Sequence, residues 1–486
     1  MKKISSFFEN HFARSLSTQE KTKPDNMRNI NIYNPYNHAV IAQVAKMSCT
    51  EVKQKINIAA GFRQKLSRFE LIGILNKATA ILEIEKNNAA RLITMESGLC
   101  LKDSRYEVER VLSVFQATIY ELTKNNEQIF SCDVFNPHAQ RKIFTLREPL
   151  QGVISAITPF NHPMNQVAHK ICPAIATNNR IILKPSEKTP LSALFLRDLL
   201  SEAGLPEEIF QVVTGDPNEI AKELICNEHV DLVAFTGSVT VGKKVALMAG
   251  YRRVILELGG NDPLIIMEDA DLEKAALLAV NGSYKNSGQR CTAIKRILVE
   301  KSVSRRFTEL LVEGTERWKM GDPMDENVDI GTLIDNAAAI ECEQRVGAAL
   351  SQGARLLHGN RRAGASYMPT VLDGVNPAMA IVQQETFGPV SPIIEFSGVE
   401  HAIAIANCTP YGLSSALCTH RLDYITRFIQ ALNVGTVNIW EVPGFRLENT
   451  PFGGIKDSGL GHKEGIQESM KNFTNIKTYS LPWELN

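Results

Sequence analysis

Short apolar runs alternate with helical patterns in this chain, and that alternation restricts the possible folds more than any other feature. The apolar runs of a first block cover residues 153–157, 181–183, 210–213 and 232–235, and its helical patterns cover about 190–203, 217–226 and 240–249. A second alternating block extends from 257 to about 438, with helical patterns near 271–286, 303–318 and 336–351. Strands that alternate with helices are typical of parallel sheets. We therefore predict an α/β fold with a doubly wound parallel sheet.

The segments that flank these blocks have different patterns. Residues 50–124 have helical apolar spacing, with Gly98 between two long segments. Two strand-like stretches follow at 128–134 and 142–150, joined by an Asn-Pro turn at 136–137, and residues 473–481 are again extended. Because two ribbon strands are not stable alone, we expect them to join another sheet.

Charge and cysteine content argue against several functional classes. Lys plus Arg and Asp plus Glu each number 53, so the formal net charge is zero and gives no support to nucleic-acid or membrane-surface binding. No apolar run approaches the roughly 18 residues of a membrane span. The nine cysteines form no CxxC and no Cys/His pair at zinc spacing, and their odd number is typical of a reducing compartment. We predict a cytoplasmic protein without a bound metal, with residues 1–30 as a flexible extension.

Two residues are candidates for nucleophilic or acid–base chemistry. Cys291 ends a polar, glycine-containing turn at 286–291, where the adjacent Arg290 would favour the reactive thiolate. The alternative is a small buried cysteine, and no nearby histidine supports a protease-like pair. Glu257 lies in the apolar run 254–260, where a lone carboxylate is costly unless it is paired or acts as an acid or base. The alternative for Glu257 is a surface position on an edge strand.

No GxGxxG motif follows a strand, so a dinucleotide site rests on two weaker signals. Gly237 and Ser238 open a helix after the run 232–235, a turn that can place a pyrophosphate at the helix N-terminus. Lys184 and Glu187 follow the run 181–183, where an ammonium and a carboxylate can both bind ribose hydroxyls. Either signal alone also occurs in ordinary solvated loops.

Seven motifs occur together in one order: TPFN at 158–161, KPSE at 184–187, FTGS at 235–238, ELGG at 257–260, GQRC at 288–291, ETFGP at 385–389 and PFGG at 451–454. In these motifs the chain resembles the NAD(P)-dependent aldehyde dehydrogenase superfamily over about residues 34–482. Residues 129–133, 142–144, 160–163, 438–444 and 471–483 are similar to its phosphonoacetaldehyde dehydrogenase branch, also labelled lactaldehyde-type.

The resemblance implies a catalytic role for three residues. Cys291 would attack the aldehyde carbon, and the Asn161 amide with the Cys291 backbone N–H would hold the oxyanion. Glu257 would then activate water to hydrolyse the thioester, which releases the carboxylic acid. A carboxylate at 257 favours hydrolysis over transfer to coenzyme A.

The resemblance also implies a cofactor site, formed by Lys184, Ser186, Glu187, Gly237, Ser238, Val241, Leu258, Glu385 and Phe387. Lys184 and Glu187 would hold the adenine ribose, and Glu385 the nicotinamide ribose. Because the carboxylate of Glu187 would repel a 2′-phosphate, we predict NAD as the preferred cofactor. Lys184 also tolerates NADP, so NADP remains an alternative.

The far end of the substrate is predicted from charge. A phosphonate carries nearly two negative charges, and its burial requires cationic donors, preferably arginine. The candidates near the substrate tunnel of the family are Arg110, His162, Arg290 and Arg446. Alternatives are a solvated Arg110, a packing role for His162 and a structural ion pair for Arg446. We predict phosphonoacetaldehyde as the substrate, with lactaldehyde, glyceraldehyde 3-phosphate or a catalytically silent relative as alternatives.

The family resemblance divides the chain into units. The dinucleotide-binding domain would comprise 31–128 and 149–256, and the α/β catalytic domain 257–448. Residues 129–148 and 449–486 resemble the β oligomerisation arms of the family, which implies a homodimer or homotetramer.

Overall fold

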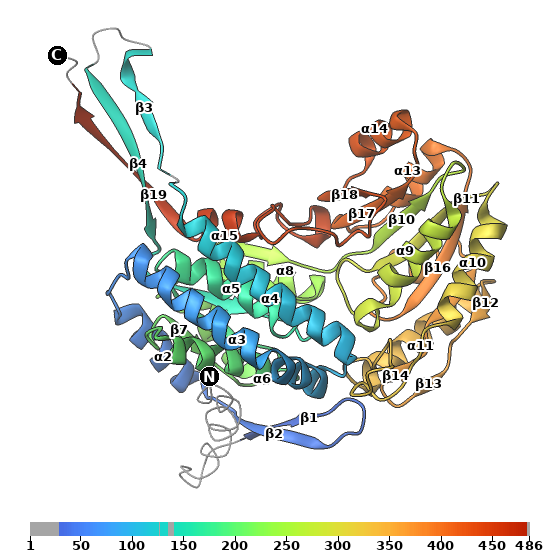
Figure 1. Ribbon diagram of the computed structural model, residues 1–486, viewed down its shortest axis with the longest axis horizontal. Coiled ribbons are helices and arrows are strands. Elements are labelled where there is room, and N and C mark those ends of the chain that lie inside the picture. Colours follow the sequence, from blue (N-terminus) through green and yellow to red (C-terminus); the bar gives the residue numbers. More distant parts are fainter. Residues whose placement is uncertain (1–28, 126, 135–139, 484–486) are drawn as a thin grey trace.

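The structure is a computed structural model that describes residues 29–125, 127–134 and 140–483. Most of the expected N-terminal extension and the Asn-Pro turn at 136–137 therefore lie outside the described residues. Two helix-covered sheets form the body, and a β-ribbon projects from the side of the first sheet (Figure 1). Within the described ranges, no helix combines the length and apolarity needed to cross a bilayer.

The first sheet is entirely parallel, with strand order β7-β6-β5-β8-β9. Its strands are β5 (Val153–Ile157), β6 (Arg180–Lys184), β7 (Phe210–Val212), β8 (Val230–Thr236) and β9 (Arg253–Glu257). The helices between them are α5 (Asn165–Ala176), α6 (Leu191–Ala203), α7 (Pro217–Cys226) and α8 (Val239–Ala249). From the central strand β5 the chain adds β6 and β7 on one side of the sheet, and it then adds β8 and β9 on the other side. The loops after β5 and β8 therefore flank the switch point, where such sheets bind ligands. The predicted doubly wound sheet is confirmed.

Within the described residues, three helices and a β-hairpin precede this sheet. They are the antiparallel pair β1 (Asn29–Tyr33) and β2 (Val40–Ala45), then α2 (Cys49–Gly61), α3 (Arg68–Ser97) and α4 (Leu101–Leu122). Capping boxes start α2 and α3, because Ser48 and Ser67 each exchange hydrogen bonds with a glutamate three residues later. Gly98 ends α3 in the left-handed region (φ 75°), as its position in the sequence predicted. The β1–β2 hairpin was not predicted.

The second sheet has seven strands in the order β12-β15-β16-β11-β10-β17-β18, parallel except for the β12–β15 pair. Its strands are β10 (Asp262–Ile266), β11 (Ile294–Glu300), β12 (Arg355–His358), β15 (Thr370–Asp373), β16 (Val390–Phe396), β17 (Ser414–Cys418) and β18 (Thr436–Ile439). Its helices are α9 (Leu272–Tyr284), α10 (Ser304–Glu316), α11 (Asn336–Ser351), α12 (Ala380–Gln383), α13 (Val399–Asn407) and α14 (Leu422–Ala431). A short hairpin, β13 (Arg362–Ala363) with β14 (Ser366–Tyr367), lies beside α11. The second alternating block of the sequence thus forms a sheet of its own.

A three-stranded antiparallel ribbon extends away from the body (Figure 1). It consists of β3 (Ile129–Ser131), β4 (Arg141–Pro149) and β19 (Thr474–Pro482), and β19 follows the short helix α15 (Ile466–Asn472). β4 lies between the other two strands and pairs with β19 along its whole length. The two ribbon strands do not join another sheet as the sequence suggested; the extended tail pairs with β4 instead, and the three strands form a sheet of their own.

Candidate active site

The turn before Cys291 has an unusual backbone. Asn286, Ser287 and Gly288 form most of the 3₁₀ turn η3 (Lys285–Gly288) and all have left-handed dihedrals, with φ of 61°, 53° and 70°. Such angles cost about 1–2 kcal/mol for each residue with a side chain, so surrounding contacts must hold this turn. A side chain at Gly288 would not fit, because its Cβ would lie 2.3 Å from the Gly388 carbonyl oxygen. This turn sets the direction in which Cys291 leaves α9 toward β11.

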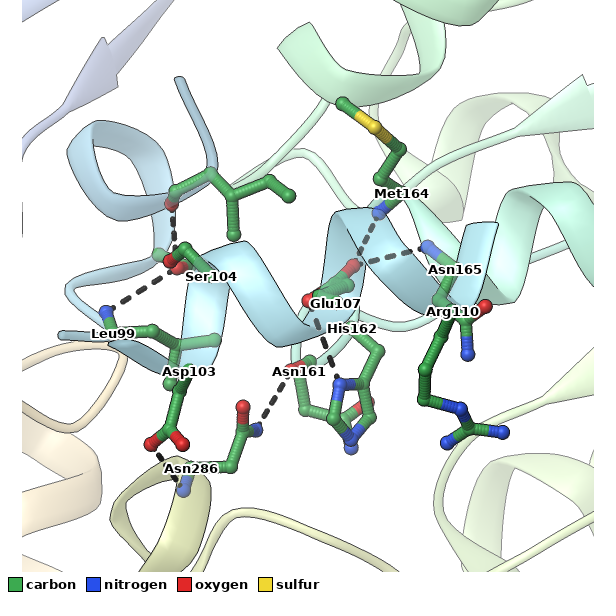
Figure 2. A network of polar contacts seen from close by, with 12 residues as sticks. Leu99, Asp103, Ser104, Glu107, Arg110, Asn161, His162, Met164, Asn165 and Asn286 are labelled. Carbon is green, nitrogen blue, oxygen red and sulfur yellow. Dashed lines mark hydrogen bonds and ion pairs between the residues drawn. The ribbon is translucent and has the colours of Figure 1, made fainter. Parts of the chain in front are cut away.

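One face of α4 holds three loops of the site. Asp103, Glu107 and Arg110 follow each other at helical spacing along this face, as Figure 2 shows. The Asp103 carboxylate accepts from the backbone N–H of Asn286 at 2.7 Å. The other two residues make the following contacts: Glu107 accepts from the N–H groups of Met164 (2.8 Å) and Asn165 (2.9 Å), and Arg110 donates twice to Glu448 (2.7 and 3.0 Å). A single helix therefore positions the nucleophile turn, the start of α5 and the loop after β18.

Asn161 lies against the nucleophile turn, as its predicted oxyanion role requires. Its side-chain amide donates to the Gln289 carbonyl oxygen at 2.8 Å. Its own carbonyl oxygen accepts from the Asn286 side chain at 2.9 Å, as Figure 2 shows. An amide nitrogen carries two hydrogens, so one N–H of Asn161 remains for a substrate oxygen. These bonds join the loop after β5 to the turn before Cys291.

The surroundings of Cys291 disfavour its thiolate form. Burial raises the pKa of Cys291 to about 12, with the Lys295 ammonium opposing this rise and the carboxylates of Asp262 and Glu385 reinforcing it. The Arg290 guanidinium, expected from the sequence to favour the thiolate, does not outweigh burial. A thiol of this kind reacts only if a base takes its proton.

Glu257 is a candidate for this base, because its carboxylate is buried and has a raised pKa. It ends β9, an edge strand, yet only 4% of it is exposed, and neither oxygen has a hydrogen-bond partner among the described residues. Burial raises the pKa of Glu257 well above its ordinary value, and the nearby Glu464 charge raises it further. The surface alternative for Glu257 is therefore wrong, because the edge of the sheet is covered here.

Two glycines bring the end of β9 against the cysteine loop. A Cβ on Gly260 would lie 2.4 Å from the Cys291 carbonyl oxygen, and one on Gly259 would lie 2.1 Å from Glu385 Oε2. The backbone after Glu257 therefore closely approaches both the cysteine loop and Glu385. It places the carboxylate, the thiol loop and Glu385 in one site.

Several charged residues beside Glu257 were missed by the sequence analysis. Lys170 on α5 is buried, and its charge lowers the pKa of Glu257. Burial opposes the ionisation of Glu464, but the charges of Arg446 and Lys170 hold the pKa of Glu464 at about 2. Lys170 was detectable as a lone cation in the apolar helix 165–176. Glu464 lies in a glycine-rich stretch with no periodic pattern, so no comparable signal marked it.

The predicted cofactor residues lie at the carboxyl ends of the first sheet and on the facing loops. Lys184 ends β6 and is buried, with its ammonium 3.3 Å from the exposed Glu187 carboxylate. Ser238 caps α8 by accepting from the N–H of Val241 (3.4 Å). A Cβ on Gly237 would lie 2.5 Å from the Phe235 ring. Ser186 accepts a hydrogen bond from the N–H of Lys188, and Leu258 packs against Gly242.

Glu385 and Phe387 complete this side of the site. Glu385 pairs with the Lys295 ammonium at 2.5 Å and accepts from the N–H of Gly260 at 3.3 Å. The Phe387 ring packs edge-on against Phe160, with centroids 5.9 Å apart. Polar groups at the carboxyl ends of the first sheet, with the Glu385 carboxylate on a facing loop, fit a dinucleotide site.

A cavity of about 570 Å³ opens beside the cysteine loop. All four cationic candidates, Arg110, His162, Arg290 and Arg446, line it. Arg110 is held by Glu448, and Arg446 donates to Glu464 at 3.0 Å and stacks on the Phe452 ring. The structural ion pair considered for Arg446 is therefore present, whereas Arg110 is not the solvated residue considered as its alternative.

The other two candidates have weaker partners. His162 Nδ1 lies 3.4 Å from Glu107 Oε2, and Arg290 donates to the Gly282 carbonyl oxygen at 2.6 Å. The buried Arg290 Nε has no hydrogen-bond partner among the described residues. The sequence thus predicted which residues line the cavity but not how their charges are compensated.

Comparison with known proteins identifies the class of enzyme. The model of the aldehyde dehydrogenase family matches residues 22–479. The chain is 36% identical to the lactaldehyde dehydrogenase of Methanocaldococcus jannaschii over 461 residues (93% of this chain, 97% of that protein). It is 37% identical to the sulfoacetaldehyde dehydrogenase of Neptuniibacter caesariensis over 416 residues (86% of this chain, 91% of that protein).

A solved structure agrees with these matches. The glyceraldehyde-3-phosphate dehydrogenase GapN of Methanocaldococcus jannaschii, complexed with NADP, superposes with a TM-score of 0.90 at 35% identity and covers 94% of this chain and 100% of that chain. The chain belongs to the aldehyde dehydrogenase family. It is an oxidoreductase that acts on aldehydes with NAD(P), and the resemblance stated from the motifs is confirmed.

Proposed function

We propose that the chain oxidises its aldehyde to the free carboxylic acid, with Cys291 as nucleophile, Asn161 as oxyanion donor and Glu257 as general base. Glu257 takes the thiol proton of Cys291 and releases it to water, and the resulting thiolate attacks the aldehyde carbon to give a thiohemiacetal anion. The oxygen of this anion accepts a hydrogen bond from the free N–H of Asn161. Bound NAD(P) supplies the hydride acceptor that converts this adduct to a thioester. Glu257 then takes a proton from water as the water attacks the thioester carbon, and the acid leaves. The buried, unpartnered carboxylate of Glu257 supports this role.

NAD is proposed as the preferred cofactor. Lys184 would bind the adenine ribose together with Glu187, and the fixed negative charge of Glu187 would repel a 2′-phosphate. The 3.3 Å contact between Lys184 and Glu187 supports this arrangement, because it keeps the carboxylate beside the ribose-binding ammonium. The structure of the relative complexed with NADP makes NADP the alternative.

The proposed substrate is a short aldehyde with an anionic far end, and phosphonoacetaldehyde is the first candidate. The observation that carries this proposal is the convergence of Arg110, His162, Arg290 and Arg446 on one cavity beside the Cys291 loop, where Arg290 has no carboxylate partner among the described residues. Hydrogen bonds to charged groups contribute about 1.5–3 kcal/mol each, so two of them give roughly a hundredfold preference or more over a neutral aldehyde.

A sulfonated aldehyde is the second candidate. Arg110 and Arg446 are already paired with Glu448 and Glu464, which reduces the positive charge available to a substrate. A sulfonate carries one negative charge where a phosphonate carries nearly two, so it needs less compensation. The similarity to a sulfoacetaldehyde dehydrogenase supports this candidate, and the similarity to a lactaldehyde dehydrogenase makes a neutral hydroxyaldehyde a further comparison.

Initial rates of NADH formation test the substrate assignment. The panel contains phosphonoacetaldehyde, sulfoacetaldehyde, lactaldehyde, glyceraldehyde 3-phosphate and propanal, each with NAD and with NADP. We expect kcat/KM for an anionic aldehyde to exceed that for propanal about a hundredfold. Equal efficiency with propanal would contradict an anionic substrate and leave only the aldehyde dehydrogenase chemistry.

We also propose that the ribbon of β3, β4 and β19 is an oligomerisation arm and that the chain forms a homodimer or homotetramer. Apolar side chains are exposed along the ribbon: Ile129, Phe130, Ile143, Leu146, Ile476, Tyr479, Leu481 and Trp483. Exposed apolar surface of this kind is typical of an interface. The predicted division into 31–128 with 149–256 and 257–448 is kept as a proposal that follows the two sheets.

A further inference from the structure

A lysine that the motifs did not single out lies in the substrate cavity. Lys285 begins η3, six residues before Cys291, and it lines the same cavity as Arg110 and Arg290. Its ammonium lies 3.2 Å from the centroid of the Tyr106 ring, a cation–π contact that orients the side chain without neutralising it. Lys285 thus places a positive charge in the cavity, and it belongs to the same turn that positions Cys291.

The other long cations of the cavity have carboxylate partners. Arg110 pairs with Glu448, Arg446 with Glu464, and Lys102 with Asp329 at 3.2 Å. Among the residues that the structure describes, no carboxylate lies within ion-pair distance of Lys285 or Arg290. A buried or half-buried charge without such a partner is costly, and binding an anion removes that cost.

We propose that Lys285, together with Arg290, binds the anionic group of the aldehyde and so determines its preference for anionic substrates. This inference rests on the proposed anionic substrate. Arg290 is adjacent to Cys291 and its Nε is a free donor, so an anion between the two cations would lie a short distance from the reacting carbon. The ion pairs of Arg110 and Arg446 would then shape the cavity rather than receive the anion.

The charge of Lys285 depends on pH in the range where such enzymes are assayed. Burial, together with the positive charges of Arg290 and Arg110 and against the opposing charge of Asp103, lowers the pKa of Lys285 to about 8. The titratable and charged groups that line the same cavity are Lys102, Asp103, Tyr106, Arg110, His162, Arg290, Asp329, Glu441 and Arg446. Preference for an anionic aldehyde should therefore decline as the pH rises past about 8 and Lys285 loses its proton.

Sulfoacetaldehyde and propanal form a suitable pair of probes, because the sulfonate stays ionised throughout and both aldehydes share the Cys291 and Glu257 chemistry. The measured quantity is the ratio of kcat/KM for sulfoacetaldehyde to kcat/KM for propanal, from about pH 6.5 to 9.5. The variants are Lys285→Met, Lys285→Arg and, as a matched control from the same cavity, Lys102→Met. Turnover of propanal shows that each variant is folded.

We expect Lys285→Met to lower this ratio about tenfold or more at pH 7 and to remove its decline above pH 8. Lys285→Arg should keep the ratio high and make it independent of pH, while Lys102→Met stays within about twofold of the wild type. A ratio that Lys285→Met leaves unchanged, in an enzyme that prefers sulfoacetaldehyde, would overturn the role of Lys285 only. A wild-type ratio near one would instead overturn the anionic substrate on which the inference rests.

Discussion

The carboxylate of Asp103 accepts a hydrogen bond of 2.7 Å from the backbone N–H of Asn286, and both groups are buried. Asn286 is the first of three consecutive left-handed residues before Cys291, and its side chain bonds the backbone of Asn161. Asp103 therefore supports the nucleophile and the oxyanion donor at once, although it touches neither.

Loss of this hydrogen bond should impair both stability and turnover. Asp103→Ala leaves a buried N–H without a partner, which costs about 1–3 kcal/mol and lowers the thermal unfolding temperature. We also expect kcat to fall at least tenfold, because the left-handed turn relaxes and Cys291 moves out of line with Asn161. Calorimetry and steady-state kinetics with propanal measure the two effects.

Asp103→Asn separates positioning from charge, because its carbonyl oxygen can still accept from Asn286. This variant should recover most of the lost stability and kcat, and the Kd for NAD should be the same in both variants. Equal impairment of the Asn and Ala variants would show that the charge of Asp103, rather than its hydrogen bond, is what the site needs.

Replacement of the nucleophile is expected to separate binding from chemistry. Cys291→Ala should abolish NADH formation, while calorimetric titration with NAD gives a Kd near that of the wild type, because the cofactor residues lie on other loops. Residual turnover above that of an enzyme-free control would exclude Cys291 as the nucleophile.

Replacement of Glu257 should slow hydrolysis more than acylation. Glu257→Gln should give one burst of NADH per active site followed by slow steady-state turnover, observed by stopped-flow absorbance. Because the pKa of Glu257 is raised, its base form accumulates as the pH rises, so the wild-type hydrolysis rate should increase with pH while that of Glu257→Gln stays flat. Normal steady-state turnover in the variant would remove Glu257 from the mechanism.

The folded protein should also tolerate this change well. A raised folded-state pKa means that Glu257 contributes most to stability below its unfolded pKa and loses that contribution as the pH rises through the folded value. Since glutamine carries no charge to bury, Glu257→Gln should match or exceed the wild type in unfolding temperature at alkaline pH. A lower unfolding temperature there would mean that the carboxylate has a stabilising partner.

The elements were largely predictable from sequence, because their signals are local. The helix predicted at 336–351 is α11, and the apolar run at 153–157 is β5. Both depend on the spacing of neighbouring apolar residues, which a single sequence displays. The β1–β2 hairpin was not predicted, because apolar and polar residues alternate only weakly along its strands and no two-residue turn joins them.

The charge balance of the site was not predictable, because it depends on contacts between distant segments. Arg110 and Glu448 are 338 residues apart, and no local sequence pattern near either residue indicates that they pair. The charge argument and the family resemblance therefore located the cavity-lining arginines but could not show that two of them are paired with carboxylates. The same limitation hid Lys285, whose importance becomes visible only when its neighbours are seen to have partners.

Cofactor preference offers a test of the ribose contact. Glu187→Ala removes the charge that would repel a 2′-phosphate and leaves the Lys184 ammonium unpaired. We expect the ratio of kcat/KM with NAD to kcat/KM with NADP to fall about tenfold, mainly because kcat/KM with NADP rises. Glu187→Gln, which keeps the size of the side chain, should show the same shift. A wild type that already prefers NADP would contradict this account of Lys184 and Glu187.

Arg446 is expected to support the general base rather than select the substrate. It pairs with the buried Glu464 at 3.0 Å, and its charge lowers the pKa of Glu257. Arg446→Ala should therefore cost about 3–5 kcal/mol of stability and shift the pH dependence of hydrolysis to higher pH, with equal losses for phosphonoacetaldehyde and propanal.

The stability deficit of this variant should shrink in acid. The low pKa of Glu464 stabilises the fold above the unfolded pKa of this carboxyl group, and the contribution is lost as the pH falls toward about 2. Adding Glu464→Gln should restore part of the stability, since the unpaired carboxylate is gone. A selective loss for phosphonoacetaldehyde, with unchanged stability and pH profile, would instead place Arg446 in direct contact with the substrate anion.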